Sequence, residues 1–234
     1  MSFGKDDREG IHQAWRCNAS TRAAWVLIMF LSAFCCLANG AFLSPEVVVA
    51  SPTGHEVYVA ATMGQQLLVV DRASGTVSRR ILLSAPPSGL VLSPDGTTVY
   101  ITAGIAPGFV SVLDVRTGTE RARIPAGHSP IAPVLSADGK TLFVGDRFRS
   151  RLLALDLAST RVRGEVAVGR EPVAAALTPN GEHLLVANLL PMAPATAPIV
   201  AARVGVVRAQ DLCRVASVEL PNGSMGLRGL CISP

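Results

Sequence analysis

The chain has 234 residues, of which 49% are hydrophobic and only 5% aromatic, and its formal net charge is +4. This length and composition exclude an intrinsically disordered chain and allow a sizeable core in one or two domains. Residues 41–234 carry 17 basic and 14 acidic side chains without a basic cluster, so no nucleic-acid partner is predicted.

The N-terminal residues have the pattern of an export signal. Four basic residues, the last of them Arg22, precede an apolar run at 23–38, and small residues follow. This order predicts a secretory signal over residues 1–40 and export to the periplasm or cell surface. The alternative is an uncleaved membrane anchor, and membrane contact is expected only through such a segment. Lipidation of Cys35 or Cys36 is disfavoured, because Phe34 and Cys35 stand where a small residue should precede the lipidated cysteine.

The region from residue 41 to 234 is dominated by one repeated turn motif. It appears as "SPTGHEVY" from Ser51, "SPDGTTVY" from Ser93, "SADGKTLF" from Ser136 and "TPNGEHLL" from Thr178, at spacings of 42, 43 and 42 residues. A fixed period of this length predicts an array of one supersecondary unit. The next copy begins 55 residues later, which indicates a Pro- and Ala-rich loop insertion at 189–201.

Each period contains four short strand patterns joined by turns. In the second period they lie at 88–93, 97–103, 109–115 and 119–126. Four antiparallel strands per period predict an all-β fold made of β-propeller blades. The first strands are apolar with small residues and suit the axis, whereas the fourth strands alternate Arg or Glu with aliphatic residues and suit the outer edge. A β-helix or a β-sandwich explains this period less well.

Three of these segments, "SPDGTTVYIT", "VSVLDVRTG" and "GREPVAAALTPNGEHLLVAN", resemble the YVTN-type bacterial β-propeller repeats of the cytochrome d1-like superfamily. The resemblance implies an exported protein of a family with surface-layer and redox-associated members. It also implies a ring of seven blades, whereas this chain supplies four blades plus one strand. A partial array is therefore expected, with self-association through its open edges. The alternative is a small four-bladed ring closed by residues 47–50 and the last strand.

Several recurring polar residues are candidates for chemistry or for turn geometry. Metal binding by a ring of carboxylates at Asp71, Asp114 and Asp156 is disfavoured, because Arg208 takes their place in the fourth unit. Capping of the following turn is the preferred role. The same structural role is predicted for the residues of the small-Pro-Asp-Gly turns: Asp95, Gly96, Asp138, Gly139, Asn180 and Gly181.

The two cysteines beyond the leader, Cys213 and Cys231, are 18 residues apart. Either a disulfide or two buried, inert thiols would fit this spacing. The chain has no Cys-x-x-Cys-His motif, so covalent c-type haem is excluded within it, and no cofactor is predicted.

The best candidates for ligand binding lie in the links between blades and in the loops between second and third strands. An aromatic ring between two guanidinium groups can stack on or pair with a planar or anionic group. The alternative is a solvated loop with Phe148 folded inward. The candidate residues are His128, Arg147, Phe148, Arg149, Arg170 and Glu171.

No nucleophile elbow, phosphate loop or dinucleotide fingerprint occurs in the sequence. The prediction is an exported, non-catalytic propeller module that binds a protein or another envelope component. One alternative is a fragment of a lactonase-like or haem-associated enzyme whose active centre lies in missing sequence. Another is a complete four-bladed protein with an axial ion site.

Overall fold

The computed structural model describes residues 43–233, which belong to the second of two compact units, Leu43–Pro234. The predicted signal at residues 1–40 lies outside the described residues. Within residues 43–233, no helix has the length and apolar character needed to span a membrane.

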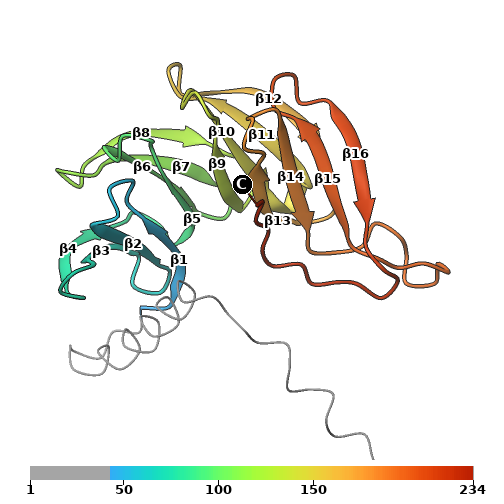
Figure 1. Cartoon of the computed structure of the whole chain (residues 1–234), viewed down its shortest axis with the longest axis horizontal. Coiled ribbons are helices and arrows are strands. Elements are labelled where there is room, and N and C mark those ends of the chain that lie inside the picture. The colour runs from blue at the N-terminus through green and yellow to red at the C-terminus, as the bar shows by residue number, and fades with distance from the viewer. Residues whose placement is uncertain (1–42, 234) are drawn as a thin grey trace, which may run out of the picture. The chain divides into compact units, whose positions relative to one another are not determined.

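Residues 43–233 form sixteen strands in four antiparallel sheets, so the predicted all-β fold of four-stranded blades is confirmed (Figure 1). The first blade contains β1 (Pro45–Ala50), β2 (Glu56–Ala61), β3 (Gln66–Asp71) and β4 (Val77–Leu82). The second contains β5 (Pro87–Leu92), β6 (Thr98–Ala103), β7 (Phe109–Asp114) and β8 (Glu120–Pro125). The third contains β9 (Pro130–Leu135), β10 (Thr141–Asp146), β11 (Arg151–Asp156) and β12 (Arg161–Ala167). The fourth contains β13 (Pro172–Leu177), β14 (His183–Asn188), β15 (Arg203–Arg208) and β16 (Arg214–Glu219).

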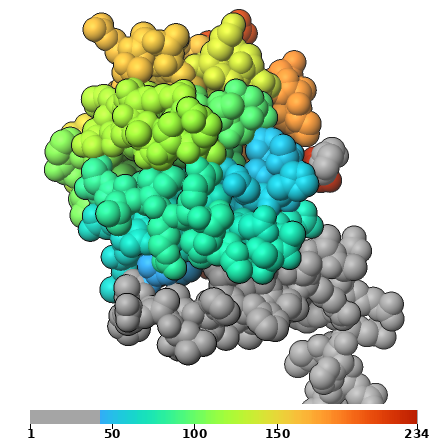
Figure 2. All heavy atoms as spheres, turned by 90° about the vertical axis from the view of Figure 1, so that its left-hand side faces the viewer, coloured from blue at the N-terminus to red at the C-terminus, as the bar shows by residue number. Residues whose placement is uncertain are grey.

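Each blade is a meander in which every strand pairs with the next one along the chain. The first strands of successive blades lie side by side, β1 next to β5, β5 next to β9 and β9 next to β13. The fourth strands lie at the outer edge, where most of their residues are exposed. The apolar first strands therefore lie toward the axis and the more polar fourth strands at the outer edge, as the sequence predicts. Figure 2 shows the blades following one another in chain order.

The hydrophobic core lies between neighbouring blades. One cluster joins Tyr58 and Val69 of the first blade to Ile101 of the second. A second cluster joins the second blade to Leu142 and neighbouring residues of the third, and a third cluster joins the third blade to the fourth. Burial of one large apolar side chain stabilises a fold by about 1.5–3 kcal/mol. Because these contacts cross between sheets, each blade depends on its neighbours for stability.

Two details differ from the sequence-based expectation. Residues 227–233, expected to begin a fifth blade, contain no strand. In the other blades a first strand pairs with the second strand of its own blade, and residues 227–233 have no such partner within the described part of the chain. At the other end, β1 pairs with β2, with a register shift between Pro45 and Val47, and completes the first blade. It therefore does not serve as a closing strand for another blade.

The expectation of buried thiols is also wrong, because Cys213 and Cys231 are both free and exposed. Cys213 lies in the turn before β16, whereas Cys231 lies in the segment that follows it.

Candidate functional site

The alternating strand directions give the blade array two distinct rims. The loops between second and third strands and the links between blades emerge at one end, here called the loop rim. The turns between first and second strands and between third and fourth strands emerge at the other end, here called the turn rim. The loop rim comprises residues 62–65, 83–86, 104–108, 126–129, 147–150, 168–171, 189–202 and 220–226, and the turn rim comprises residues 51–55, 72–76, 93–97, 115–119, 136–140, 157–160, 178–182 and 209–213.

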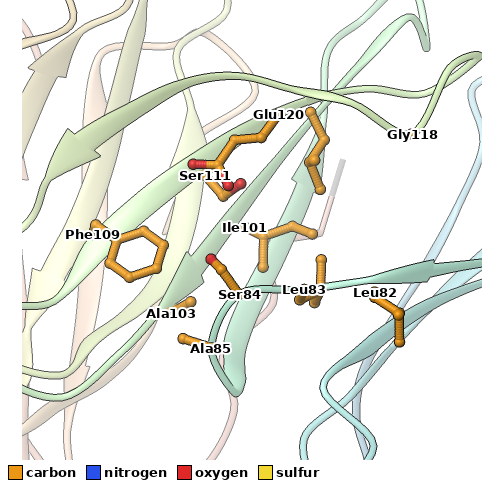
Figure 3. Close-up of a pocket in the computed structure, with 11 residues that line it drawn as sticks. Leu82, Leu83, Ser84, Ala85, Ile101, Ala103, Phe109, Ser111, Gly118 and Glu120 are labelled. Atoms are coloured by element: carbon orange, nitrogen blue, oxygen red, sulfur yellow. The ribbon is translucent and has the colours of Figure 1, made fainter.

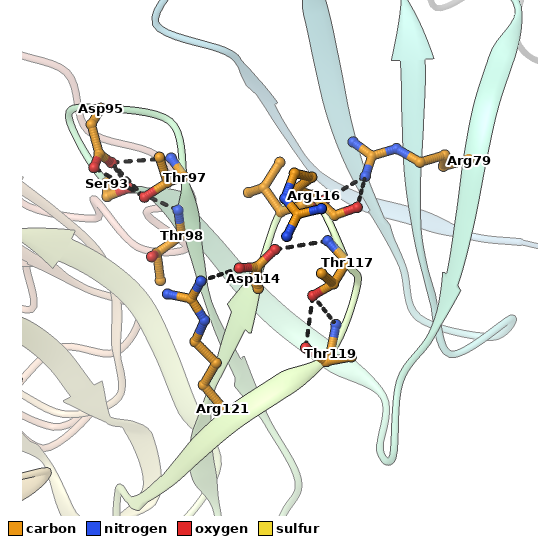
Figure 4. A network of polar contacts seen from close by, with 11 residues as sticks. Arg79, Ser93, Asp95, Thr97, Thr98, Asp114, Arg116, Thr117, Thr119 and Arg121 are labelled. Atoms are coloured by element: carbon orange, nitrogen blue, oxygen red, sulfur yellow. Dashed lines mark hydrogen bonds and ion pairs between the residues drawn. The ribbon is translucent and has the colours of Figure 1, made fainter.

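The carboxylates of the turn rim accept hydrogen bonds from the backbone and hydroxyl groups of their own turns. Oδ1 of Asp95 accepts a hydrogen bond from Ser93 Oγ at 2.5 Å and from the backbone N–H of Thr97 at 3.0 Å (Figure 4). These bonds, with that of the Ser93 hydroxyl first, hold the pKa of Asp95 below its ordinary value. Gly96 follows with a φ of +69°, which favours glycine. The turns at Asp138 and Asn180 repeat this pattern, with Gly139 and Gly181 also at positive φ.

The carboxylates that end the third strands point into the turn that follows each strand. The backbone N–H groups of Ser74, Thr117 and Ser159 donate to Oδ1 of Asp71, Asp114 and Asp156 at 2.7, 2.7 and 2.6 Å, respectively. Arg121 also pairs with the Asp114 carboxylate. Local hydrogen bonding lowers the pKa of all three carboxylates.

In the fourth blade Arg208 stands at the end of the third strand, and Asp211 supplies the contact instead. Asp211 pairs with Arg208 at 2.9 Å and accepts the N–H of Cys213 at 3.0 Å. Within residues 43–233, no group of three or more His, Cys, Asp and Glu side chains is placed to hold a metal ion.

On the loop rim, four of the six predicted ligand-binding residues come together at the end of the third blade, two from its own loop and one from each of the links before and after it. The short 3-10 helix Arg147–Arg149 follows β10 and turns back into β11 at Ser150, which has a left-handed backbone. The Arg147 guanidinium donates to Glu171 Oε2 from Nε at 3.1 Å and from Nη2 at 2.9 Å. Its Cζ lies 5.2 Å from the centre of the Phe148 ring.

Phe148 is held in the open rather than folded inward. Its ring meets the His128 ring edge-to-face at 5.1 Å, and 54% of the residue remains exposed. The geometry therefore presents one aromatic face beside a guanidinium whose own charge is already paired. Arg149, the neighbour of Phe148, is exposed. Arg170 turns away from this group and donates from Nη1 to the carbonyl of Pro191, in the insertion, at 3.5 Å.

Sequence reasoning missed the residue beneath this group, Asp146. Its side chain is fully buried, and it accepts the backbone N–H of His128 at 2.9 Å and Arg151 Nη2 at 2.9 Å. Arg151 also pairs with Glu165, and the two carboxylates, that of Glu165 first, raise the pKa of Arg151. The available signal was a polar residue ending an otherwise apolar second strand, which recurs as Asn188 in the next blade.

A separate small cleft lies between the first and second blades, with a volume of about 130 Å³ (Figure 3). At its border the Arg123 guanidinium lies 4.2 Å from the Phe109 ring centre, donates to Ser84 Oγ at 2.8 Å and pairs with Glu120 at 2.7 Å. Small-molecule sites usually have volumes of roughly 300–1,000 Å³. The cleft is therefore too small to be the main ligand site. It is lined by Leu82, Leu83, Ser84, Ala85, Ile101, Ala103, Phe109, Ser111, Leu113, Gly118 and Glu120.

Comparison with known proteins identifies the fold. No protein-family model and no curated protein matches the sequence. Among the many solved structures that do match is the hydrazine synthase of Kuenenia stuttgartiensis, a β-propeller-containing protein, with a TM-score of 0.70 and 19% sequence identity over 80% of this chain. The described unit is a β-propeller array. The alignment covers 52% of the other chain, so this propeller spans about half of that chain's length. At this identity the likeness shows the fold and assigns no site residue.

Proposed function

We propose that this propeller is an exported, non-catalytic binding module of the cell envelope that engages its partner with the loop rim. The observation that carries the proposal is the half-exposed Phe148 ring, fixed between His128 and Arg147. The Arg147–Glu171 pair and the buried Asp146 hold the surrounding backbone and side chains in place. A site whose side chains are ordered before binding loses less conformational entropy when a ligand arrives.

The chemistry of this site favours a planar or anionic group. The Phe148 ring can stack on a flat group, and the exposed Arg149 beside it can pair with an anion. Arg147 has its charge matched by Glu171, so its contribution is to orient the ring.

The assignment to the YVTN-type repeats and to the exported compartment belongs to the same proposal. Its support is the repeated turn motif together with the basic and apolar pattern of residues 1–40. Both features fit an array that works outside the cytoplasm.

The second candidate is a propeller segment of a redox or hydrolytic enzyme. It is favoured only by the structural likeness to a hydrazine synthase. The absorption spectrum and metal content of the purified full chain separate the two candidates, because a haem or metal bound in stoichiometric amount supports the enzyme.

The experiment that tests the binding proposal compares two charge reversals on opposite rims. Purified full-length wild type, Arg149→Glu and the matched control Lys140→Glu are titrated onto an isolated bacterial envelope fraction. Lys140 is an exposed base on the turn rim. We expect Arg149→Glu to weaken retention by about tenfold, equivalent to about 1.4 kcal/mol, and Lys140→Glu to bind like wild type. Equal effects of the two reversals, or no retention of wild type, would contradict the proposal.

A further inference from the structure

An exposed large apolar side chain recurs at the same place in every blade. The loop between the second and third strands carries Met63 in the first blade, Ile105 in the second, Phe148 in the third and Met192 in the fourth. These residues are 67%, 69%, 54% and 55% exposed, respectively. A single exposed apolar side chain is ordinary on a protein surface. Its recurrence in the same loop of all four blades, in three short loops and in the longer insertion, is a pattern that points to an interaction surface.

All four tips lie on the loop rim, where Ile199 and Met225 add two more exposed apolar side chains. Within the described turn-rim segments, no large apolar side chain is exposed. The apolar tips therefore form an arc across one end of all four blades.

The two rims also differ in charge. The loop-rim segments contain Arg147, Arg149 and Arg170, and their one acidic residue, Glu171, is paired with Arg147. The turn-rim segments, counted in the same way, carry four carboxylates and three basic side chains: Asp95, Asp138, Glu182 and Asp211, against Arg72, Arg116 and Lys140. The third strands of the blades end at this rim in three further carboxylates, Asp71, Asp114 and Asp156, and in Arg208.

We propose that the loop rim rests on the surface of an anionic lipid bilayer. This inference depends on the proposed function and names the envelope component that the loop rim contacts. The tips of Met63, Ile105, Phe148 and Met192 enter the headgroup layer. The exposed Arg149 and Arg170 lie at the lipid phosphates. Separate apolar tips spread over four blades, with bases and no unpaired acid among them, suit a fluid planar surface better than the single packed centre typical of a protein interface. The propeller thus binds lipid peripherally and turns its acidic rim away.

The test uses tryptophan probes on the two rims of the full chain. The natural tryptophans, Trp15 and Trp25, are replaced by Phe, and a single probe is placed by Phe148→Trp or, as the matched turn-rim control, by Ala73→Trp. Each protein is mixed with vesicles of brominated phosphatidylglycerol and phosphatidylcholine, or of brominated phosphatidylcholine alone. We expect quenching at position 148 that requires phosphatidylglycerol and weakens with salt, and none at position 73. A local probe reports which rim meets lipid even if the apolar run at residues 23–38 also binds the vesicle.

A second arm changes the apolar tips. Met63→Ser, Ile105→Ser and Met192→Ser are combined in the Phe148→Trp background, and circular dichroism checks that the fold is kept. We expect at least tenfold weaker vesicle-dependent quenching. Equal quenching at both rims, or quenching by phosphatidylcholine alone, overturns the inference. If the envelope fraction still retains the protein through Arg149 while no vesicle quenches position 148, the partner is a protein, and the proposed function stands without this inference.

Discussion

Gly127 lies directly against the buried carboxylate of Asp146. A Cβ atom at residue 127 would stand 2.2 Å from Asp146 Oδ2, and Gly127 has a φ of +80°. The link into the third blade is therefore docked on the end of its second strand, which fixes the position of His128 beside Phe148. Gly169 and Asn188 repeat the relationship at the next link, where a Cβ would lie 2.6 Å from the Asn188 amide carbon.

Gly127→Ala should destabilise the propeller more than Gly75→Ala. Both glycines have positive φ, and strain of that kind costs about 1–3 kcal/mol for other residues. Only Gly127 also faces a close neighbour, because a Cβ at Gly75 would meet no atom within 4 Å. Urea unfolding of both variants measures the difference. If both variants lose the same unfolding free energy, the close contact between residue 127 and the Asp146 carboxylate does not contribute to the cost.

The Asp146 carboxylate should be replaceable by an amide at modest cost but not by an apolar group. Asp146→Asn keeps an acceptor for the His128 N–H, and an amide side chain, Asn188, already occupies the equivalent end of β14. Asp146→Leu leaves that N–H and one donor of Arg151 without their partner, a loss of about 1–3 kcal/mol for each unmet buried group. The midpoint of urea unfolding checks the ranking. A leucine variant as stable as the asparagine variant would refute it.

Leu142→Ala should lower stability by about 2–5 kcal/mol, because it opens a cavity in the cluster shared by the second and third blades. Val218→Ala, on the exposed outer strand of the fourth blade, should change stability by less than about 0.5 kcal/mol. Thermal unfolding followed by circular dichroism compares them. We expect one transition, shifted as a whole by Leu142→Ala, and two separated transitions would mean that the blades do not depend on one another.

Stability should fall in acid because turn-rim carboxylates have lowered pKa values. Hydrogen bonds keep the pKa of Asp95 and Asp138 below their ordinary value in the folded chain. Such a group stabilises the fold above its unfolded pKa of about 3.9, and this stabilisation is lost as the pH falls through the lower folded pKa. The double variant Asp95→Asn and Asp138→Asn should keep both turns, because Asn180 makes the same contacts in the fourth blade. Its unfolding free energy should fall less steeply at low pH than that of the wild type. Urea midpoints between pH 2 and pH 7 measure the slope, and an unchanged slope would assign the acid sensitivity to other groups.

The fold was predictable because the same turn motif occurs four times in the sequence at nearly constant spacing. The turn residues from Ser93 to Thr98 act through local hydrogen bonds, so their spacing alone located the blades. The absence of a strand at residues 227–233 was not predictable in this way, since a strand depends on a partner distant in sequence. The free and exposed state of Cys213 also depends on which edge of a blade it occupies.

The candidate site was predictable in its location but not in its internal contacts. Topology alone places links and loops on one rim, so His128 and Phe148 were predicted to share a face, whereas their edge-to-face ring contact was not predicted. The pairing of Arg147 with Glu171, rather than with a ligand, depends on side-chain geometry across two blades. The central place of Asp146 depends on the close approach of Gly127, which no local pattern encodes.

Hydroxyl-radical footprinting of the full chain, free and bound to the envelope fraction, tests most directly that the loop rim is the binding surface. Met63, Met192 and Met225 are reactive, exposed reporters on that rim, and His55 is an exposed reporter on the turn rim. The account predicts that oxidation of the three methionines falls severalfold on binding while that of His55 stays constant. Protection of His55 with unchanged methionine oxidation would contradict it.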